Sequence, residues 1–194
     1  MCSCFQWFKD TNLKANHNII SVGSLAQMYK APDIVLLAME ILKKRGINIH
    51  LTWLGDGIFK QDMVNLANKL GVDADFKGNV SSDIVYKNLS ESDIFLLVSR
   101  TEGLPRAVVE AMAHGLPCIG SRVGGIPELL EPSVLVEKEN PEALADLIQR
   151  LVTDYDFTNE QAKRNLNEAL LYKEDRLKEL RNQYFEYIKA QRDE

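Results

Sequence analysis

Residues 93–98 of the chain, with the sequence DIFLLV, form a nearly continuous apolar run between polar segments. A strand of this composition is typical of a parallel sheet that is covered by helices on both faces. Comparable apolar runs recur along the sequence, and most of them lead into a glycine or a polar loop. The expected strands are residues 18–23, 47–54, 74–77, 93–98, 117–120 and 134–136. This pattern restricts the chain to a small set of α/β folds.

The segments between these strands have the signals of helices. Residues 33–45 repeat apolar side chains at helical spacing behind Pro32, and residues 58–70 end before Gly71, a typical C-terminal cap. Further helices are expected at residues 82–89 and 105–114. Parallel strands joined by right-handed helical crossovers form an open sheet. We therefore expect an α/β fold with a Rossmann-like, doubly wound parallel sheet of five to six strands and helices on both faces.

Extra C-terminal helices are expected beyond residue 140, at residues 141–152, 158–171 and 173–191. In the last of them, one stripe contains Leu177, Leu180, Tyr184 and Tyr187 or Ile188. We expect this stripe to pack against the domain's own sheet, and contact with a neighbouring domain is the alternative. The chain is thus divided into an N-terminal arm over residues 1–17, an α/β domain over residues 18–152 and C-terminal helices over residues 153–194.

Charge and composition exclude several classes of partner. The formal net charge is −5, from 23 Lys and Arg against 28 Asp and Glu, so nucleic acid is not expected to bind. No apolar run approaches the ~20 residues of a membrane span, and the first residues do not form a secretory signal. The cysteines Cys2, Cys4 and Cys118 lack metal-ligand spacing. These features predict a reduced, cytoplasmic protein with at most peripheral membrane contact.

Glycine-containing loops follow the expected strands, at the edge of the sheet where such folds bind ligands. These loops contain Gly23, Ser24 and Lys30 after the first strand, Gly55, Asp56 and Gly57 after the second, Gly78 and Asn79 after the third, residues 99–106 after the fourth and residues 121–128 after the fifth. Glycine lets the backbone approach a ligand closely, and the helix N-termini that begin here favour phosphate. The row of loops predicts a nucleotide-like ligand.

Two glutamates, Glu102 and Glu110, belong to the segment SRTEGLPRAVVEAMA and are separated by seven residues. The first stands in the loop after a strand, and the second lies about two turns into the following helix, so the pair can bracket a small polar ligand. Glu110 is flanked by apolar residues on a helix that is expected to be partly buried. A buried carboxylate needs a hydrogen-bond partner, which makes Glu110 a candidate ligand-binding residue.

Residues 18 to about 152 resemble the C-terminal, donor-binding domain of the GT-B glycosyltransferases of the retaining group 1, or family 4, class. The resemblance runs through ISVGSL with Lys30, WLGDG, FKGNV, SDIFLLVSRTEGLPRAVVEAMAHGLPCIGSRVGGIPELL and NPEALADLI, in the order and spacing of that family. Residues 18–152 would then form a nucleotide-sugar-binding domain. The arm over residues 1–17 would be either the remnant of a linker to a missing acceptor domain or a segment that packs on its own domain.

The resemblance implies roles for individual residues. Glu102 would lie near the donor sugar, Glu110 would accept hydrogen bonds from the ribose, and Lys30 would neutralise the diphosphate together with the amides of Gly103 and Leu104. Glu102 and Lys30 are the expected catalytic residues. The expected donor-binding residues are Gly23, Ser24, Lys30, Gly55, Asp56, Gly57, Gly103, Leu104, Arg106 and Glu110. No cofactor and no metal ion are implied, and no metal-type cluster follows a strand.

The implied reaction transfers a hexose-type sugar from a UDP- or GDP-sugar, with retention, to an acceptor hydroxyl in polysaccharide or glycoconjugate biosynthesis. Glu102 would act either as a nucleophile or as a stabiliser of an ion-pair-like transition state. The acceptor, a glycan or a lipid-linked sugar at the inner face of the membrane, would bind to the acceptor domain that has no counterpart here. The chain alone would therefore have little or no transferase activity.

Two other functions compete with this interpretation. A non-catalytic nucleotide-sugar-binding or regulatory module of the same fold is the alternative, although Lys30, Glu102 and Glu110 occur together. A nicotinamide-dependent oxidoreductase is disfavoured because the first strand is not followed by GxGxxG.

Two departures from the family pattern bear on the donor. Many members carry Arg at the position of Ser24, and Phe-Gly is common at the position of Leu104 and Pro105. The first departure removes one expected diphosphate contact, which Lys30 or Arg106 would have to replace.

Overall fold

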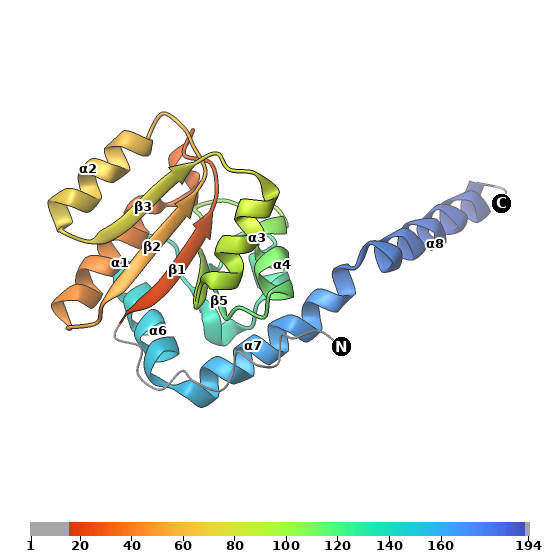
Figure 1. Ribbon diagram of the computed structural model, residues 1–194. Coiled ribbons are helices and arrows are strands. Elements are labelled where there is room, and N and C mark those ends of the chain that lie inside the picture. The colour runs from red at the N-terminus through yellow and green to blue at the C-terminus, as the bar shows by residue number, and fades with distance from the viewer. Residues whose placement is uncertain (1–15, 193–194) are drawn as a thin grey trace.

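Six parallel strands form one sheet in the computed structural model, which describes residues 16–192 (Figure 1). The strands are β1 (His17–Val22), β2 (Ile49–Leu54), β3 (Asp73–Gly78), β4 (Ile94–Leu97), β5 (Cys118–Ser121) and β6 (Leu135–Val136). Their order is β3-β2-β1-β4-β5-β6, and every pairing between them is parallel. The Rossmann-like, doubly wound fold expected from the sequence is confirmed. Nearly all of the expected N-terminal arm lies outside the described residues.

The order of the strands reverses between β1 and β4. The chain builds β1, β2 and β3 toward one edge, returns to place β4 beside β1, and then builds β5 and β6 toward the other edge. Ile19 of β1 pairs with Ile94 of β4, and Ile20 pairs with Phe95. Open α/β sheets bind ligands at the carboxyl edge, next to such a reversal, so the loops that follow β1 and β4 are the expected place for a ligand.

Helices cover both faces of this sheet. They are α1 (Pro32–Lys44), α2 (Lys60–Leu70), α3 (Ser82–Glu91), α4 (Arg106–Ala113), α5 (Ile126–Leu129), α6 (Pro141–Thr153) and α7 (Tyr155–Ala169). Short 3-10 turns occur at η2 (Met28–Lys30), η3 (Pro132–Val134) and η4 (Leu170–Tyr172). All four residues of β4 are buried, which agrees with its apolar sequence. Cys118 of β5 is a buried free thiol, and burial raises its pKa. It is therefore a core residue rather than a nucleophile.

Some helix boundaries differ from those expected. Helix α2 begins at Lys60 instead of residue 58, because the preceding loop packs against the loop after β1. Helix α7 begins at Tyr155 instead of residue 158, because the Asp154 side chain caps it by accepting a hydrogen bond from the Phe157 amide at 3.1 Å. The short helix α5 and the 3-10 turns were not expected from the periodicity.

Helix α7 is attached to the body of the fold by buried polar contacts. The Asn165 side chain is fully buried and donates to the Leu116 carbonyl at 2.8 Å, beside β5. Arg164 donates to the carbonyl of Leu129 in α5, and Gln161 donates to Glu131 at 3.1 Å. The helix therefore belongs with the sheet and extends the packed body past residue 152.

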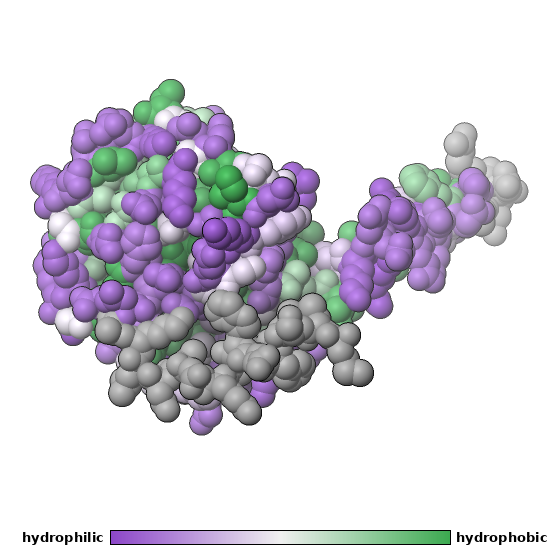
Figure 2. Space-filling view, viewed as in Figure 1, coloured by the Kyte–Doolittle hydropathy of each residue, from purple (hydrophilic) through white to green (hydrophobic). Residues whose placement is uncertain are grey.

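The final helix, α8 (Glu174–Arg192), extends away from this body (Figure 1). Its stripe is exposed, with 39% of Leu177, 50% of Leu180 and 62% of Tyr184 accessible, and apolar patches are visible along it in Figure 2. The expectation that the stripe packs against the sheet is wrong, because other helices already cover both faces. None of the helices in the described region is both long enough and apolar enough to cross a membrane.

The contact of Asn165 provides a test of the α7 attachment. Asn165→Ala leaves the Leu116 carbonyl with only the weak thiol donor of Cys118, so we expect the free energy of unfolding to fall by about 1–3 kcal/mol. Asn167→Ala, at an exposed position of the same helix, is the matched control and should change it by less than about 0.5 kcal/mol. Urea unfolding measures both, and equal effects would contradict the attachment.

Candidate functional site

Residues from the loops after β1 and β4 meet at the carboxyl edge of the sheet. Lys30 stands at the end of η2, shortly after β1, and its ammonium group forms an ion pair with the carboxylate of Glu102, in the loop after β4. The Ser99 hydroxyl donates to the same carboxylate oxygen at 3.0 Å. The side chains of Lys30 and Glu102 are 13% and 14% exposed. The structure therefore joins the two expected catalytic residues across the point where the strand order reverses.

The aliphatic part of Lys30 lies against Gly23. A Cβ atom at residue 23 would stand 3.0 Å from Cγ and 3.2 Å from Cδ of Lys30. The Gly23 carbonyl is fixed in turn by the Trp53 indole, which donates to it at 2.9 Å. The absence of a side chain at Gly23 lets the lysine cross the end of β1 toward Glu102. Gly23, one of the expected donor-binding residues, thus contributes by leaving space for the Lys30 side chain.

The loop of Gly55, Asp56 and Gly57 supports the loop after β1. The Asp56 carbonyl accepts from the Leu25 amide at 2.9 Å and from the Ser24 hydroxyl at 3.3 Å. Both glycines have positive φ, and a Cβ at Gly55 would stand 2.0 Å from the Gly23 carbonyl oxygen. These glycines are explained by close packing between two loops, in addition to the ligand contact implied by the family resemblance.

A second pair of glycines, after β5, supports the loop of Glu102. Gly124 has a φ of +52°, and a Cβ there would stand 1.9 Å from the Glu102 carbonyl oxygen. The Gly125 amide donates to the Gly103 carbonyl at 3.0 Å. At the base of this loop, the Ser121 hydroxyl donates to the Ser99 carbonyl at 2.6 Å. The individual roles of Ser99, Gly124 and Gly125 were missed, although the Gly-Gly pair was within the expected loop after the fifth strand.

The N-terminus of α4 faces the same edge and has free hydrogen-bonding groups. Within the described part of the chain, the amides of Gly103 and Leu104 donate no hydrogen bond and the Arg106 side chain has no partner. Leu104 and Arg106 are exposed. Two free amides, a helix N-terminus and an exposed cation can together accommodate an anionic group.

Glu110 lies further along α4 and is partly buried. Its carboxylate makes no hydrogen bond or ion pair with any residue that the structure describes. Burial lowers the pKa of His114, one turn later, and the negative charge of Glu110 opposes part of that shift. The histidine is therefore neutral near pH 7 and does not neutralise Glu110. The carboxylate is free to accept hydrogen bonds from a ligand.

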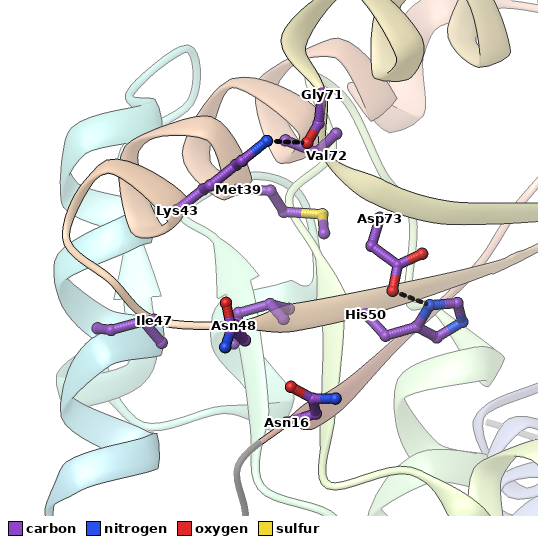
Figure 3. Close-up of a pocket in the computed structure, with 10 residues that line it drawn as sticks. Asn16, Met39, Lys43, Ile47, Asn48, His50, Gly71, Val72 and Asp73 are labelled. Atoms are coloured by element: carbon purple, nitrogen blue, oxygen red, sulfur yellow. Dashed lines mark hydrogen bonds and ion pairs between the residues drawn. The ribbon is translucent and has the colours of Figure 1, made fainter.

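A cavity of about 220 Å³ lies at the opposite edge of the sheet, where β1, β2 and β3 begin (Figure 3). None of the expected site residues lines it. Its charged side chains are paired within the protein, since Lys43 donates to the Gly71 carbonyl and His50 contacts Asp73 at 3.0 Å. The candidate site therefore lies at the carboxyl edge, where the expected residues meet, rather than in this cavity. No group of residues able to hold a metal ion is found in residues 16–192.

Comparison with known proteins identifies the family. A family model described as glycosyl transferases group 1 matches residues 5–169, which is most of the chain. The chain therefore belongs to the group 1 glycosyltransferases.

Two relatives show how much of such proteins the chain represents. It is 28% identical over 172 residues to N-acetyl-alpha-D-glucosaminyl L-malate synthase of Bacillus anthracis, covering 86% of this chain and 43% of the relative. It is 34% identical over 148 residues to the amylovoran biosynthesis glycosyltransferase AmsK of Erwinia amylovora, covering 69% of this chain and 35% of the relative. The chain thus spans less than half the length of these relatives.

The fold agrees with the family. The crystal structure of Anabaena HepE in complex with UDP and glucose superposes with a TM-score of 0.76 at 22% identity, covering 91% of this chain and 49% of HepE. At this identity the likeness concerns the fold, which is the GT-B type.

The packing of Gly124 on the Glu102 loop leads to a second prediction. In Gly124→Ala, the alanine would have to adopt a positive φ, and its Cβ would clash with the Glu102 backbone. We therefore expect the substitution to lower the free energy of unfolding by about 3 kcal/mol or more. Gly115→Ala is the matched control, because Gly115 has a φ of +72° but open space around the added Cβ. The control substitution should lower the free energy of unfolding by about 1 kcal/mol. Equal costs in urea unfolding would show that the close approach to Glu102 is unimportant.

Proposed function

We propose that this chain binds a nucleoside diphosphate sugar at the carboxyl edge of β1 and β4 and forms the donor-binding half of a glycosyltransferase. The observation that carries the proposal is the Lys30–Glu102 pair at the point where the strand order reverses. One cation and one carboxylate, both mostly buried and in contact with each other at this edge, suit a ligand with an anionic and a hydroxyl-rich part. A diphosphate linked to a sugar has both.

Lys30 is assigned to the diphosphate. The protein carries a net charge of −5, so attraction of an anion depends on cations placed at the site. A hydrogen bond from a charged donor contributes about 1.5–3 kcal/mol, more than a neutral one. The free amides of Gly103 and Leu104 complete the anion site. Arg106, exposed at the start of α4, replaces the arginine that many relatives carry at the position of Ser24.

Glu110 is assigned to the ribose and Glu102 to the sugar. The unpaired carboxylate of Glu110 can accept hydrogen bonds from two neighbouring hydroxyl groups. Glu102 is paired with Lys30 and Ser99, so an arriving diphosphate competes with Glu102 for the lysine. This competition releases the glutamate toward the sugar at the moment when the donor binds.

The proposed reaction transfers a hexose-type sugar with retention to an acceptor hydroxyl. The bond between the anomeric carbon and the diphosphate oxygen breaks, and its electron pair stays on the diphosphate. A bond from the acceptor oxygen to that carbon forms, and the hydroxyl proton passes to the departing diphosphate. Lys30 and the α4 amides stabilise the negative charge that grows on the departing diphosphate. Glu102 stabilises the positive charge at the anomeric carbon. We assign no metal ion to these steps.

The acceptor and the setting also belong to the proposal. Because the chain spans less than half of its relatives, we infer that the acceptor, a glycan or a lipid-linked sugar, is bound by a further domain of the complete enzyme. Polysaccharide or glycoconjugate biosynthesis in the cytoplasm, at the inner face of the membrane, is the proposed setting. The isolated chain should bind donor without ordinary transfer rates of about 1–1000 per second.

Calorimetric titration of the chain with UDP-, GDP- and ADP-sugars, and with NAD, tests the ligand class. We expect saturable binding of one nucleotide sugar and no binding of NAD. The arrangement of Lys30 across from Glu102 is the reason, because it offers a single diphosphate site without the glycine-rich turn of dinucleotide-binding folds. Binding of NAD alone would contradict the proposal.

The two glutamates should have opposite effects on binding of the nucleoside diphosphate. Glu110→Gln should weaken binding of UDP about tenfold, because a charged acceptor for the ribose is lost. Glu102→Gln should strengthen it about threefold or more, because Lys30 loses its competing partner and the site loses a negative charge. Glu40→Gln on α1, where Glu40 pairs with Lys44, is the control. Equal weakening by both site variants in calorimetry would show that the roles are wrong.

A further inference from the structure

Arg100 lies between Ser99 and Glu102 on the loop after β4, and its guanidinium group is held by acceptors of the protein. Its Nη1 and Nη2 atoms donate to the two carboxylate oxygens of Asp33 at 3.0 and 2.7 Å. Its Nε stands 2.6 Å from Glu139, and Nη1 also donates to the Met28 carbonyl. Each guanidinium nitrogen therefore already has an acceptor. Arg100 has no free donor with which to bind a phosphate.

The partners of Arg100 flank Lys30 in the sequence. Met28 begins the η2 turn that ends at Lys30, and Asp33 lies in the first turn of α1, directly after it. The backbone adds a third connection, because the Arg100 amide donates to the Tyr29 carbonyl at 2.6 Å. Arg100 thus connects the loop that carries Glu102 to the turn that carries Lys30, from both sides of the lysine.

Two residues of this connection have unfavourable backbone conformations. Ala31, next to Lys30, has a φ of 48°, and Glu139 has a φ of 59°; both are in the left-handed region, which non-glycine residues rarely adopt. Such conformations persist only where surrounding contacts impose them. Glu139 contacts Arg100 directly. Ala31 lies in the sequence between Met28 and Asp33, which are both partners of Arg100. Hydrogen bonding to Asp33 also raises the pKa of Arg100 further above its ordinary range, so the cation is permanent.

We propose that Arg100 is a positioning residue for the donor diphosphate, which it serves by holding Lys30 opposite Glu102. The inference rests on the proposed function, because it assumes that Lys30 meets a diphosphate. Arg100 itself does not touch the ligand. Its loss lets the η2 turn relax, and the lysine ammonium then spends less time at the anion site.

A double-mutant cycle distinguishes this role from general support of the fold. Binding of UDP, with GDP as a parallel probe, is measured by calorimetry for the wild-type chain, Lys30→Ala, Arg100→Ala and the double variant. We expect Lys30→Ala to weaken binding at least about tenfold and Arg100→Ala about fivefold. If Arg100 acts through Lys30, the double variant binds within about twofold of Lys30→Ala. If the two fold-changes in UDP affinity instead multiply in the double variant, Arg100 acts independently of Lys30, and the proposal is overturned.

Arg45→Ala is the matched control. Arg45 is 32% exposed against 28% for Arg100, and it also joins two elements, by pairing α1 with Asp146 and Gln149 of α6. Its loss should change the affinity for UDP by less than about twofold. If Arg100→Ala and Arg45→Ala have equal effects on binding, the positioning role is excluded.

A milder variant keeps the test decisive if Arg100→Ala does not fold. Glu139→Gln removes one charged partner of Arg100 at a half-exposed position. It should weaken UDP binding about threefold in the wild-type background. In the Lys30→Ala background, it should leave UDP binding unchanged. An equal effect in both backgrounds overturns the proposal. If the wild-type chain binds neither UDP nor GDP, the proposed function fails together with this inference. If it binds either one and the cycle is additive, only the role of Arg100 fails.

Discussion

The ion pair between Lys30 and Glu102 is the interaction on which the functional arrangement depends. It forms because β1 and β4, 75 residues apart at Ser21 and Leu96, lie side by side and bring the loops that follow them into contact. Gly23 leaves room for the lysine, and Gly124 leaves room for the glutamate loop. The site is therefore a consequence of the strand order and of the missing side chains at these two glycines.

In the proposed function, attraction of the anion is local rather than global. The net charge of −5 opposes a diphosphate at long range, so Lys30, Arg106 and the amides before α4 would have to act at short range. The cost of removing Lys30 from water is offset by its ion pair with Glu102, so a ligand that replaces Glu102 would meet a cation that is already desolvated and oriented. Such preorganisation would let one lysine contribute strongly to binding and to departure of the proposed diphosphate.

The sequence allows much of the fold to be predicted, because apolar runs such as residues 93–98 have one stable environment, a strand buried on both faces. Glu102 and Glu110 were found from their spacing across a loop and the following helix, Lys30 from its place after the first strand, and the family resemblance supplied their expected roles. Ser99, Arg100 and Gly124 were not identified individually, since their roles arise from contacts between loops distant in the sequence. The apolar stripe of α8 has the periodicity of a packed helix, but periodicity does not identify the surface that the stripe contacts. Both faces of the sheet are already covered by other helices.

In the proposed complex, a nucleoside diphosphate takes the place of Glu102 beside Lys30. A crystal structure of the chain with UDP is the decisive test. We expect a phosphate oxygen within about 2.7–3.2 Å of the Lys30 ammonium, with the Glu102 carboxylate displaced from it and the ribose hydroxyls on Glu110. UDP bound elsewhere, or an intact Lys30–Glu102 pair beside bound UDP, would show that this arrangement is wrong.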